Sequence, residues 1–228
     1  MAITRNLYAG LKALRFKEST RTIWVDALCI NQENIEERNH QVQLMAYIYS
    51  GAERVVVWLG DADAGTGPAL DMISQCENGF ETKIDSNENG DLNEEHGYTF
   101  HGVPPSTDPK WKLLGTFLLR PWFKRAWVVQ EVALAKVPRE VLFVCGTDVI
   151  PWERLLKAMY LIFLTDLGHL VGCGNESIIG LDFYQNALRL DRNYMAEKCV
   201  ILRFEVLLFA EGARLATDDR DRVFALWD

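Results

Sequence analysis

The chain has 228 residues, of which 49% are hydrophobic, so it is long enough to bury one sizeable core or two small ones. Its net charge of −8 argues against nucleic acid or an anionic membrane surface as the principal partner. Five cysteines form no CxxC pair, and no apolar secretory core follows the first methionine. We therefore expect a globular cytoplasmic protein with reduced thiols and no membrane span.

The N-terminal part shows the pattern of a β-α-β unit. After a first helix capped by Thr4, residues 22–30 are almost continuously apolar, which predicts a strand buried on both faces. A helix is expected over 34–50 and a second strand over 55–59. The apolar stripe of that helix consists of Ile35, Val42, Met45, Tyr49 and Ala52. We expect the two strands to be parallel and joined by a right-handed crossover.

The middle of the chain contains a polar insertion. A short helix over 68–76 leads into residues 79–109, which are rich in Asn, Glu, Gly and Pro and are expected to form a long exposed loop. Residues 82–102 are expected to be mobile and dispensable for folding. Asp108 and Pro109 are suitable residues to begin the helix that follows.

The second half of the chain shows one more helix followed by a strand, and its pattern is helical after that. A helix is expected over 122–136 and a strand over 140–145, and the pattern from Pro151 onward is helical. Strands that alternate with helices, followed by helices alone, predict one α/β domain over 1–228. Its parallel sheet would be flanked by helices, and its C-terminal part would be mostly helical.

The helix expected over 122–136 holds one acid in its apolar part, Glu131. Trp127 and Glu131 are four residues apart and would share a helix face. Desolvation would tune the ionisation of a carboxylate held beside an indole in a partly dry cleft, as it does in many catalytic acids and bases. The alternative is a structural ion pair between Glu131 and Arg125, Lys124 or a distant arginine.

Asp26 lies inside the expected first strand. A carboxylate there is costly unless it is paired or lies near the carboxyl end of the strand, where ligands bind in open parallel sheets. Asn31 and Gln32 follow and offer amide donors and acceptors, so we expect a ligand-binding edge here, close to the start of the next helix. Alternatively, Asp26 bonds to neighbouring backbone or to Arg38, and Asn31 caps the helix.

The chain lacks the patterns typical of a metal site. The four histidines are scattered without ligand spacing. Residues 85–90 match the first half of a calcium-binding loop, but the twelfth position is His96, where a bidentate glutamate is required. We expect neither a metal nor a permanently bound cofactor.

Three blocks of this sequence resemble the heterokaryon incompatibility (HET) domain of filamentous fungi. They are Trp24–Gln32 with the helix and strand that follow, residues 120–135, and residues 219–225. The resemblance implies a role in incompatibility and programmed cell death when genetically unlike hyphae fuse. Family members usually open with a strand similar to Ala-Leu-Ser-Tyr-x-Trp-Gly, whereas this chain begins at the first helix, so we expect an abbreviated domain.

The order of elements is also similar to that of TIR domains, which implies a TIR-like (flavodoxin-like) sheet. In TIR enzymes the glutamate of a Trp-x-x-x-Glu helix supports cleavage of the nicotinamide–ribose bond of NAD. That role would fall on Glu131, with Trp127 lining the pocket and NAD as the substrate. Asp26 and Glu131 would then face one cleft, with Arg38 or Arg125 between the two acids.

A non-enzymatic signalling module is the competing expectation. Such a module would self-associate or bind a partner in a cell-death pathway. The aromatic side chains that could form its surface are Trp111, Trp122, Phe123 and Trp152, although residues of this kind are more often in the core. Release of nicotinamide from NAD would separate the two functions.

Overall fold

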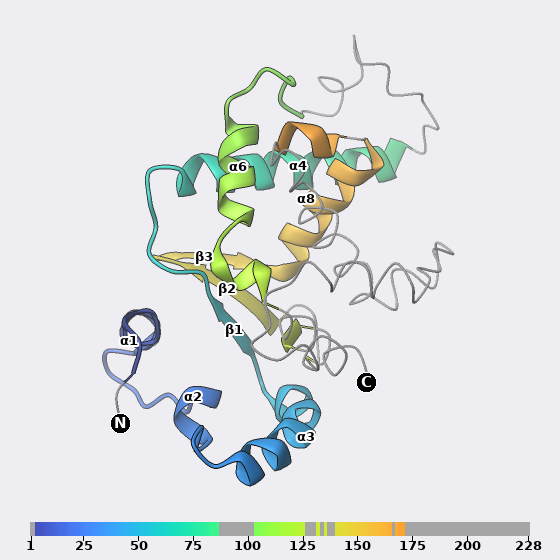
Figure 1. Ribbon diagram of the computed structural model, residues 1–228. Helices are drawn as coiled ribbons and strands as arrows, with labels where there is room; N and C mark the ends of the chain where they lie inside the picture. The colour runs from blue at the N-terminus through green and yellow to red at the C-terminus, as the bar shows by residue number, and fades with distance from the viewer. Residues whose placement is uncertain are drawn as a thin grey trace.

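The computed structural model describes residues 3–86, 103–125, 131–132, 135, 140–165 and 167–171. Its elements are, in chain order, α1 (Arg5–Leu14), α2 (Asp26–Cys29), α3 (Ile35–Gly51), β1 (Val55–Trp58), α4 (Thr66–Ser86), α6 (Lys110–Leu118), η1 (Pro121–Lys124), β2 (Val141–Cys145), β3 (Asp148–Pro151), α8 (Trp152–Leu164) and η3 (Leu167–Val171). In Figure 1 the sheet lies in the middle, with α4, α6 and α8 on one side and α1, α2 and α3 on the other. We call residues 3–54 the arm, and the described residues from Val55 onward the body.

The sheet has the order β1-β2-β3. β1 and β2 are parallel, with Val55 opposite Val141, which confirms the strands expected over 55–59 and 140–145. β3 is antiparallel to β2 and follows a tight turn at Gly146, whose φ of 59° favours glycine. The sequence of β3 gives no strand signal, because it is short and ends in proline. The described residues thus form a mixed α/β fold that is mostly helical.

The strand expected over 22–30 is not formed. Val25 is extended, but Asp26–Cys29 forms the single turn α2, in which the Leu28 and Cys29 amides donate to the Val25 carbonyl. A strand requires a neighbour for its backbone groups, and no described segment pairs with these residues. The helical turn satisfies the same groups locally. The β-α-β unit predicted over 22–59 is therefore wrong, and the parallel part of the sheet is the β1–β2 pair.

The first two long helices agree with the sequence pattern. Thr4 caps α1, accepting a hydrogen bond from the Leu7 amide at 3.2 Å. α3 covers the expected range of 34–50 within a residue, and Asn34 is its N-cap. Their apolar stripes, however, find little to pack against. Gly10 and Ile30 are the buried residues among those described in the arm.

The insertion expected over 79–109 is shorter than predicted. α4 runs to Ser86, well past the expected end at 76. Phe80, which lies beyond that expected end, is still buried. Beyond the undescribed residues 87–102, Val103 is buried, and the Trp111 indole donates to the Pro105 carbonyl at 3.1 Å. Both ends of the insertion therefore belong to the folded body, while the mobility of residues 82–102 stays a prediction. α6 begins one residue later than expected, at Lys110 with Pro109 as its N-cap, and the Asp108 carboxylate accepts from the Lys110 amide at 2.8 Å.

The helix expected over 122–136 is interrupted at its start. Pro121–Lys124 forms the short 3-10 turn η1, and Arg125 is extended, with ψ of 144°. Glu131 lies in a separate helical stretch, after residues that are not described. The guanidinium of the preceding Arg120 anchors η1 to the segment that follows β1. It donates to the carbonyls of Leu59 and Asp61 and to the side chains of Asp63 and Thr66.

The core of the body is built around Phe143 of β2. Its ring lies edge-on to Trp122 at 5.0 Å and stacks on Trp152 at 5.6 Å. The four aromatic residues that a partner surface would require are all buried, at exposures of 1% for Trp111, 8% for Trp122, 3% for Phe123 and 2% for Trp152. They pack in the core because aromatic rings bury the largest apolar areas. The core alternative is therefore confirmed, and these residues form no partner surface.

Candidate functional site

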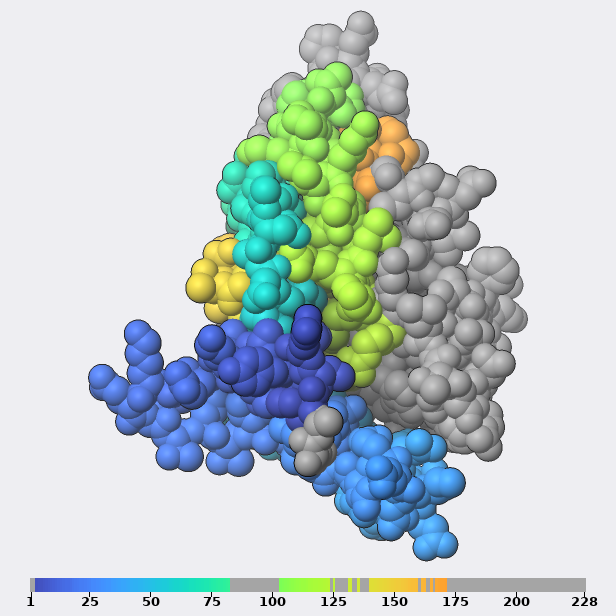
Figure 2. Space-filling view, turned by 60° about the vertical axis from the view of Figure 1, so that its left-hand side comes forward, coloured from blue at the N-terminus to red at the C-terminus, as the bar shows by residue number. Residues whose placement is uncertain are grey.

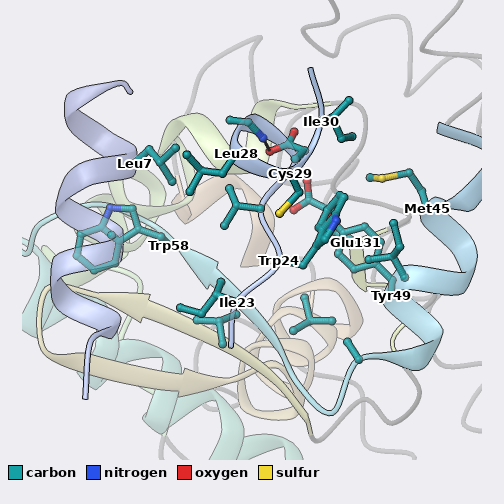
Figure 3. A pocket seen from close by; sticks show the side chains of 18 of the residues that line it. Leu7, Ile23, Trp24, Leu28, Cys29, Ile30, Met45, Tyr49, Trp58 and Glu131 are labelled. Carbon is teal, nitrogen blue, oxygen red and sulfur yellow. Dashed lines mark hydrogen bonds between the residues drawn. The ribbon is translucent and has the colours of Figure 1, made fainter. Parts of the chain in front are cut away.

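A large cavity lies between the arm and β1, although α1 itself contacts Trp58. It has a volume of about 2450 Å³ and is lined by α1, residues 21–33, α3 and β1, together with Trp122, Arg125 and Glu131. Small-molecule pockets usually hold ~300–1,000 Å³, so this space exceeds a simple ligand site. In the close view of Figure 3, Glu131 lies beside Trp24 and Tyr49 at one end, and Trp58 lies against α1 at the other.

Glu131 lines this cavity with two partners for its carboxylate. Its Oε2 accepts a hydrogen bond from the Trp122 indole at 2.9 Å, and its Oε1 lies 3.4 Å from Nη1 of Arg125. The side chain is 13% exposed. Burial raises the pKa of Glu131, while the Arg125 charge and the Trp122 hydrogen bond oppose that shift. Glu131 thus forms the ion pair with Arg125 that the sequence left open as an alternative, and it also lines the cavity.

The indole beside Glu131 is not the one that the sequence spacing suggests. Trp127, expected on the same helix face, lies outside the described residues. Trp122 reaches Glu131 from nine positions away, because the extended Arg125 interrupts the helix between them. No periodic pattern predicts such a contact, so Trp122 could not be found from the sequence as a partner of the acid.

Trp24 and Tyr49 form an aromatic wall next to Glu131. Their rings meet edge-to-face, with centroids 6.3 Å apart. Burial raises the pKa of the Tyr49 hydroxyl, and the charges of Glu131 and Asp26 raise it further. The phenol is therefore neutral at physiological pH and can act as a hydrogen-bond donor. Trp24 belongs to the block that carries the family resemblance, and Tyr49 belongs to the apolar stripe of α3.

Asp26 does not lie at the carboxyl edge of a central strand. It is exposed, it opens α2, and its Oδ1 accepts from the Ala27 amide at 2.7 Å. Its carbonyl accepts from the side-chain amide of Gln32 at 3.0 Å. The expected placement is therefore wrong, and the alternative, in which Asp26 bonds to neighbouring backbone, is confirmed. The strand-end position is lost because residues 22–30 do not join the sheet.

Asn31 organises the turn before α3 and does not cap the helix. Its Oδ1 accepts from the Glu33 amide at 3.1 Å, and its own amide donates to Glu37 at 2.9 Å. The cap is Asn34, which accepts from the Glu37 amide. Asn31 thus fixes the entry to the helix while it lines the cavity.

The expected convergence of the two acids is present, but without the expected strand. Asp26, Asn31, Gln32, Arg38 and Glu131 all line the same cavity. The charge of Asp26 contributes to the raised pKa of Glu131, and Arg125 is the arginine that pairs with the acid. The binding and catalytic roles of these residues stay predictions.

A metal site and a membrane-spanning helix can both be looked for in the described ranges. There, no group of three or more His, Cys, Asp or Glu side chains could hold a metal ion. In the same part of the chain, no helix is both long and apolar enough to cross a bilayer.

Comparisons with known proteins agree with the resemblance seen in the sequence. The sequence model of the family described as "Heterokaryon incompatibility protein (HET)" matches residues 1–131, which include Asp26 and Glu131. The chain is 30% identical over 188 residues to "Heterokaryon incompatibility protein 6, OR allele" of Neurospora crassa. That alignment covers 70% of this chain and 26% of the relative, so the chain spans about a quarter of the relative's length. No solved structure matches the chain, and the TIR-like arrangement stays a prediction.

Proposed function

Because the chain belongs to the heterokaryon incompatibility (HET) family, we propose that it acts in fungal incompatibility as a cytoplasmic cell-death effector that hydrolyses NAD. The name of the Neurospora crassa relative supports the incompatibility role. The observation that carries the enzymatic part is the carboxyl group of Glu131. It borders a cavity, is 13% exposed, and is held by Trp122 and Arg125.

Glu131 has the surroundings that cleavage of a ribosyl bond requires. Departure of nicotinamide leaves an oxocarbenium-like ribose, which a nearby carboxylate can stabilise directly or through the ribose hydroxyls. Burial strengthens such an interaction because water is excluded. Arg125 and the Trp122 indole favour the anion that this step needs, against the effect of burial.

The aromatic wall and the polar side chains that line the cavity can supply contacts for the rest of a dinucleotide. Trp24 and Tyr49 offer faces and edges on which a planar ring can stack. Arg38, on α3, lines the same cavity and can pair with a phosphate group. Asp26, Asn31 and Gln32 lie on the intervening turn, where their side chains can bond to hydroxyl or amide groups.

The test is incubation of the purified chain with NAD while nicotinamide release is followed. Glu131→Gln keeps the size of the side chain and its acceptor for Trp122 but removes the charge. We expect the variant to lose release by roughly a hundredfold or more and to abolish cell killing on expression in a fungal host. A matched control is Glu140→Gln, because Glu140 pairs with Arg54 on the surface of the body.

Equal release by the wild type and by Glu131→Gln would contradict the catalytic assignment. If Glu131→Gln unfolds, as judged by circular dichroism, Glu131 is a structural ion-pair residue. Trp122→Phe gives an independent measure, since it keeps an aromatic ring in the core and removes the donor to Glu131. It should lower release without loss of the fold.

The second candidate function is a non-enzymatic module that binds another protein. Apolar side chains on the arm favour it, since Tyr47 is 76% exposed, Ile35 64% and Tyr8 60%. Exposed apolar residues that gather on one part of a surface often mark protein contacts. Cell killing that persists in Glu131→Gln, without nicotinamide release by either protein, would favour this function over hydrolysis.

A further inference from the structure

The two edges of the sheet differ in their chemistry. β3 ends in Pro151 and begins with Asp148, and such residues keep other strands from pairing with an edge. β1 reads Val-Val-Val-Trp and carries no charge. Among the described strands it pairs with β2 alone, and no described strand lies on its other side. An apolar edge of this kind is a template for another strand.

The cavity lies along this edge of β1. Val55, Val56, Val57 and Trp58 all line it. Residues 22–25 border the same cavity and belong to no described strand, although they read Thr-Ile-Trp-Val. Two segments with strand-forming sequences thus border one space, and no described strand pairs with either of them there.

The helices beside the cavity also present apolar faces to it. The residues that do so on α1 are Leu7, Leu11 and Leu14, and those on α3 are Ile35, Val42, Met45 and Tyr49. In Figure 2 the arm spreads below the body, and its first, dark blue part lies directly against the body. The Trp58 indole N–H is buried without a hydrogen-bond partner among the described residues.

We propose that this cavity is a docking site for an extended, almost continuously apolar segment of a partner polypeptide, which adds as a strand to the free edge of β1. Only a strand supplies backbone donors and acceptors to a sheet edge together with apolar side chains on both of its faces. A small ligand would leave most of about 2450 Å³ unfilled. This docking does not depend on NAD hydrolysis.

The probe is a synthetic peptide, Lys-Thr-Val-Val-Ile-Val-Val-Thr-Lys, with a control peptide in which proline replaces the central isoleucine. Binding is measured by titration calorimetry and located by hydrogen exchange. We expect the first peptide to bind and to slow exchange at the amides of Val56 and Trp58, which face away from β2, but not at those of β3. The proline peptide should bind at least about tenfold more weakly, because it loses a backbone donor and its extended pairing.

Two variants test the walls of the cavity. Val42→Glu places a charge on the apolar stripe of α3 and should weaken peptide binding roughly tenfold or more. His40→Glu places the same charge on an exposed position of the same helix, outside the lining, and should bind like the wild type. Circular dichroism checks that both variants keep their helices.

Three results would overturn the proposal. One is a folded protein that binds neither peptide. Another is protection of the β3 amides in place of the Val56 and Trp58 amides. The third is slow exchange at the Val56 and Trp58 amides, which face away from β2, before any peptide is added. If that protection rises with protein concentration, a second copy covers the edge; if it does not, residues 22–25 close onto β1 themselves.

Discussion

The arm and the body use similar amphipathic helices but bury them to different extents. α8 of the body places Leu155, Ala158 and Leu161 in the core at 0% exposure. α3 of the arm has a stripe of comparable residues, yet none of its residues is buried. The difference lies in what faces each helix, because α8 packs on α4 whereas α3 faces the cavity. An apolar stripe therefore predicts a helix well, but it does not predict burial.

The largest expected effect concerns the core of the body. Phe143→Ala removes a ring with 0% exposure that contacts Trp122 and Trp152, and it should lower the free energy of unfolding by about 3–5 kcal/mol. Tyr47→Ala, at an exposed position of the arm, should change it by less than about 0.5 kcal/mol. Urea denaturation of both variants measures the contrast. Similar losses would mean that the arm is packed as tightly as the body.

Two helical glycines sharpen the same comparison. A Cβ at Gly115 of α6 would collide with the carbonyl oxygen of Val171, whereas one at Gly51 of α3 meets nothing within 4 Å. Gly115→Ala should therefore cost about 1–3 kcal/mol of stability. Gly51→Ala should add about 0.5–1 kcal/mol, since alanine favours the helix. Thermal melting measures both changes, and a stabilised Gly115→Ala would contradict the packing of α6 on η3.

Glu131, which lines the cavity between the arm and the body, should make the stability of the protein depend on pH. Burial raises its pKa above the ordinary value of 4.5, so the folded state binds more protons than the unfolded state between the two pKa values. Wild-type stability should therefore fall relative to Glu131→Gln as pH rises from 4.5, and the difference should level off above the folded-state pKa. Urea denaturation across this range gives the difference. A wild type that gains stability relative to Glu131→Gln as the pH rises would mean that Arg125 and Trp122 outweigh burial.

The smallest expected effect is at the ion pair that joins the end of the arm to the body. Nε of Arg54 lies 3.2 Å from Glu140, and the two side chains are 45% and 43% exposed. Such a pair contributes roughly 0–1 kcal/mol. A double-mutant cycle of Arg54→Ala and Glu140→Ala measures it at low and high salt. A coupling that salt does not weaken would indicate a pair that is more shielded than its exposure suggests.

The sequence by itself determined the elements that depend on neighbours along the chain. Thr4 and the residues after it specify α1, and the apolar runs at 55–59 and 140–145 specify the parallel strands β1 and β2. The blocks at 24–32 and 120–135 were sufficient to indicate the family, which the match over 1–131 shows. These features follow from capping, periodicity and motif order, each of which can be read locally.

The tertiary structure alone decided the surroundings of Glu131 and the state of residues 22–30. A strand-like sequence forms a strand only when another strand satisfies its backbone groups, and no described segment does so for 22–30. Asp26 therefore opens a helical turn, although it still reaches the cavity of Glu131. The Trp122–Glu131 hydrogen bond depends on a break in the helix at Arg125, and contacts between such positions are set by packing and not by periodicity.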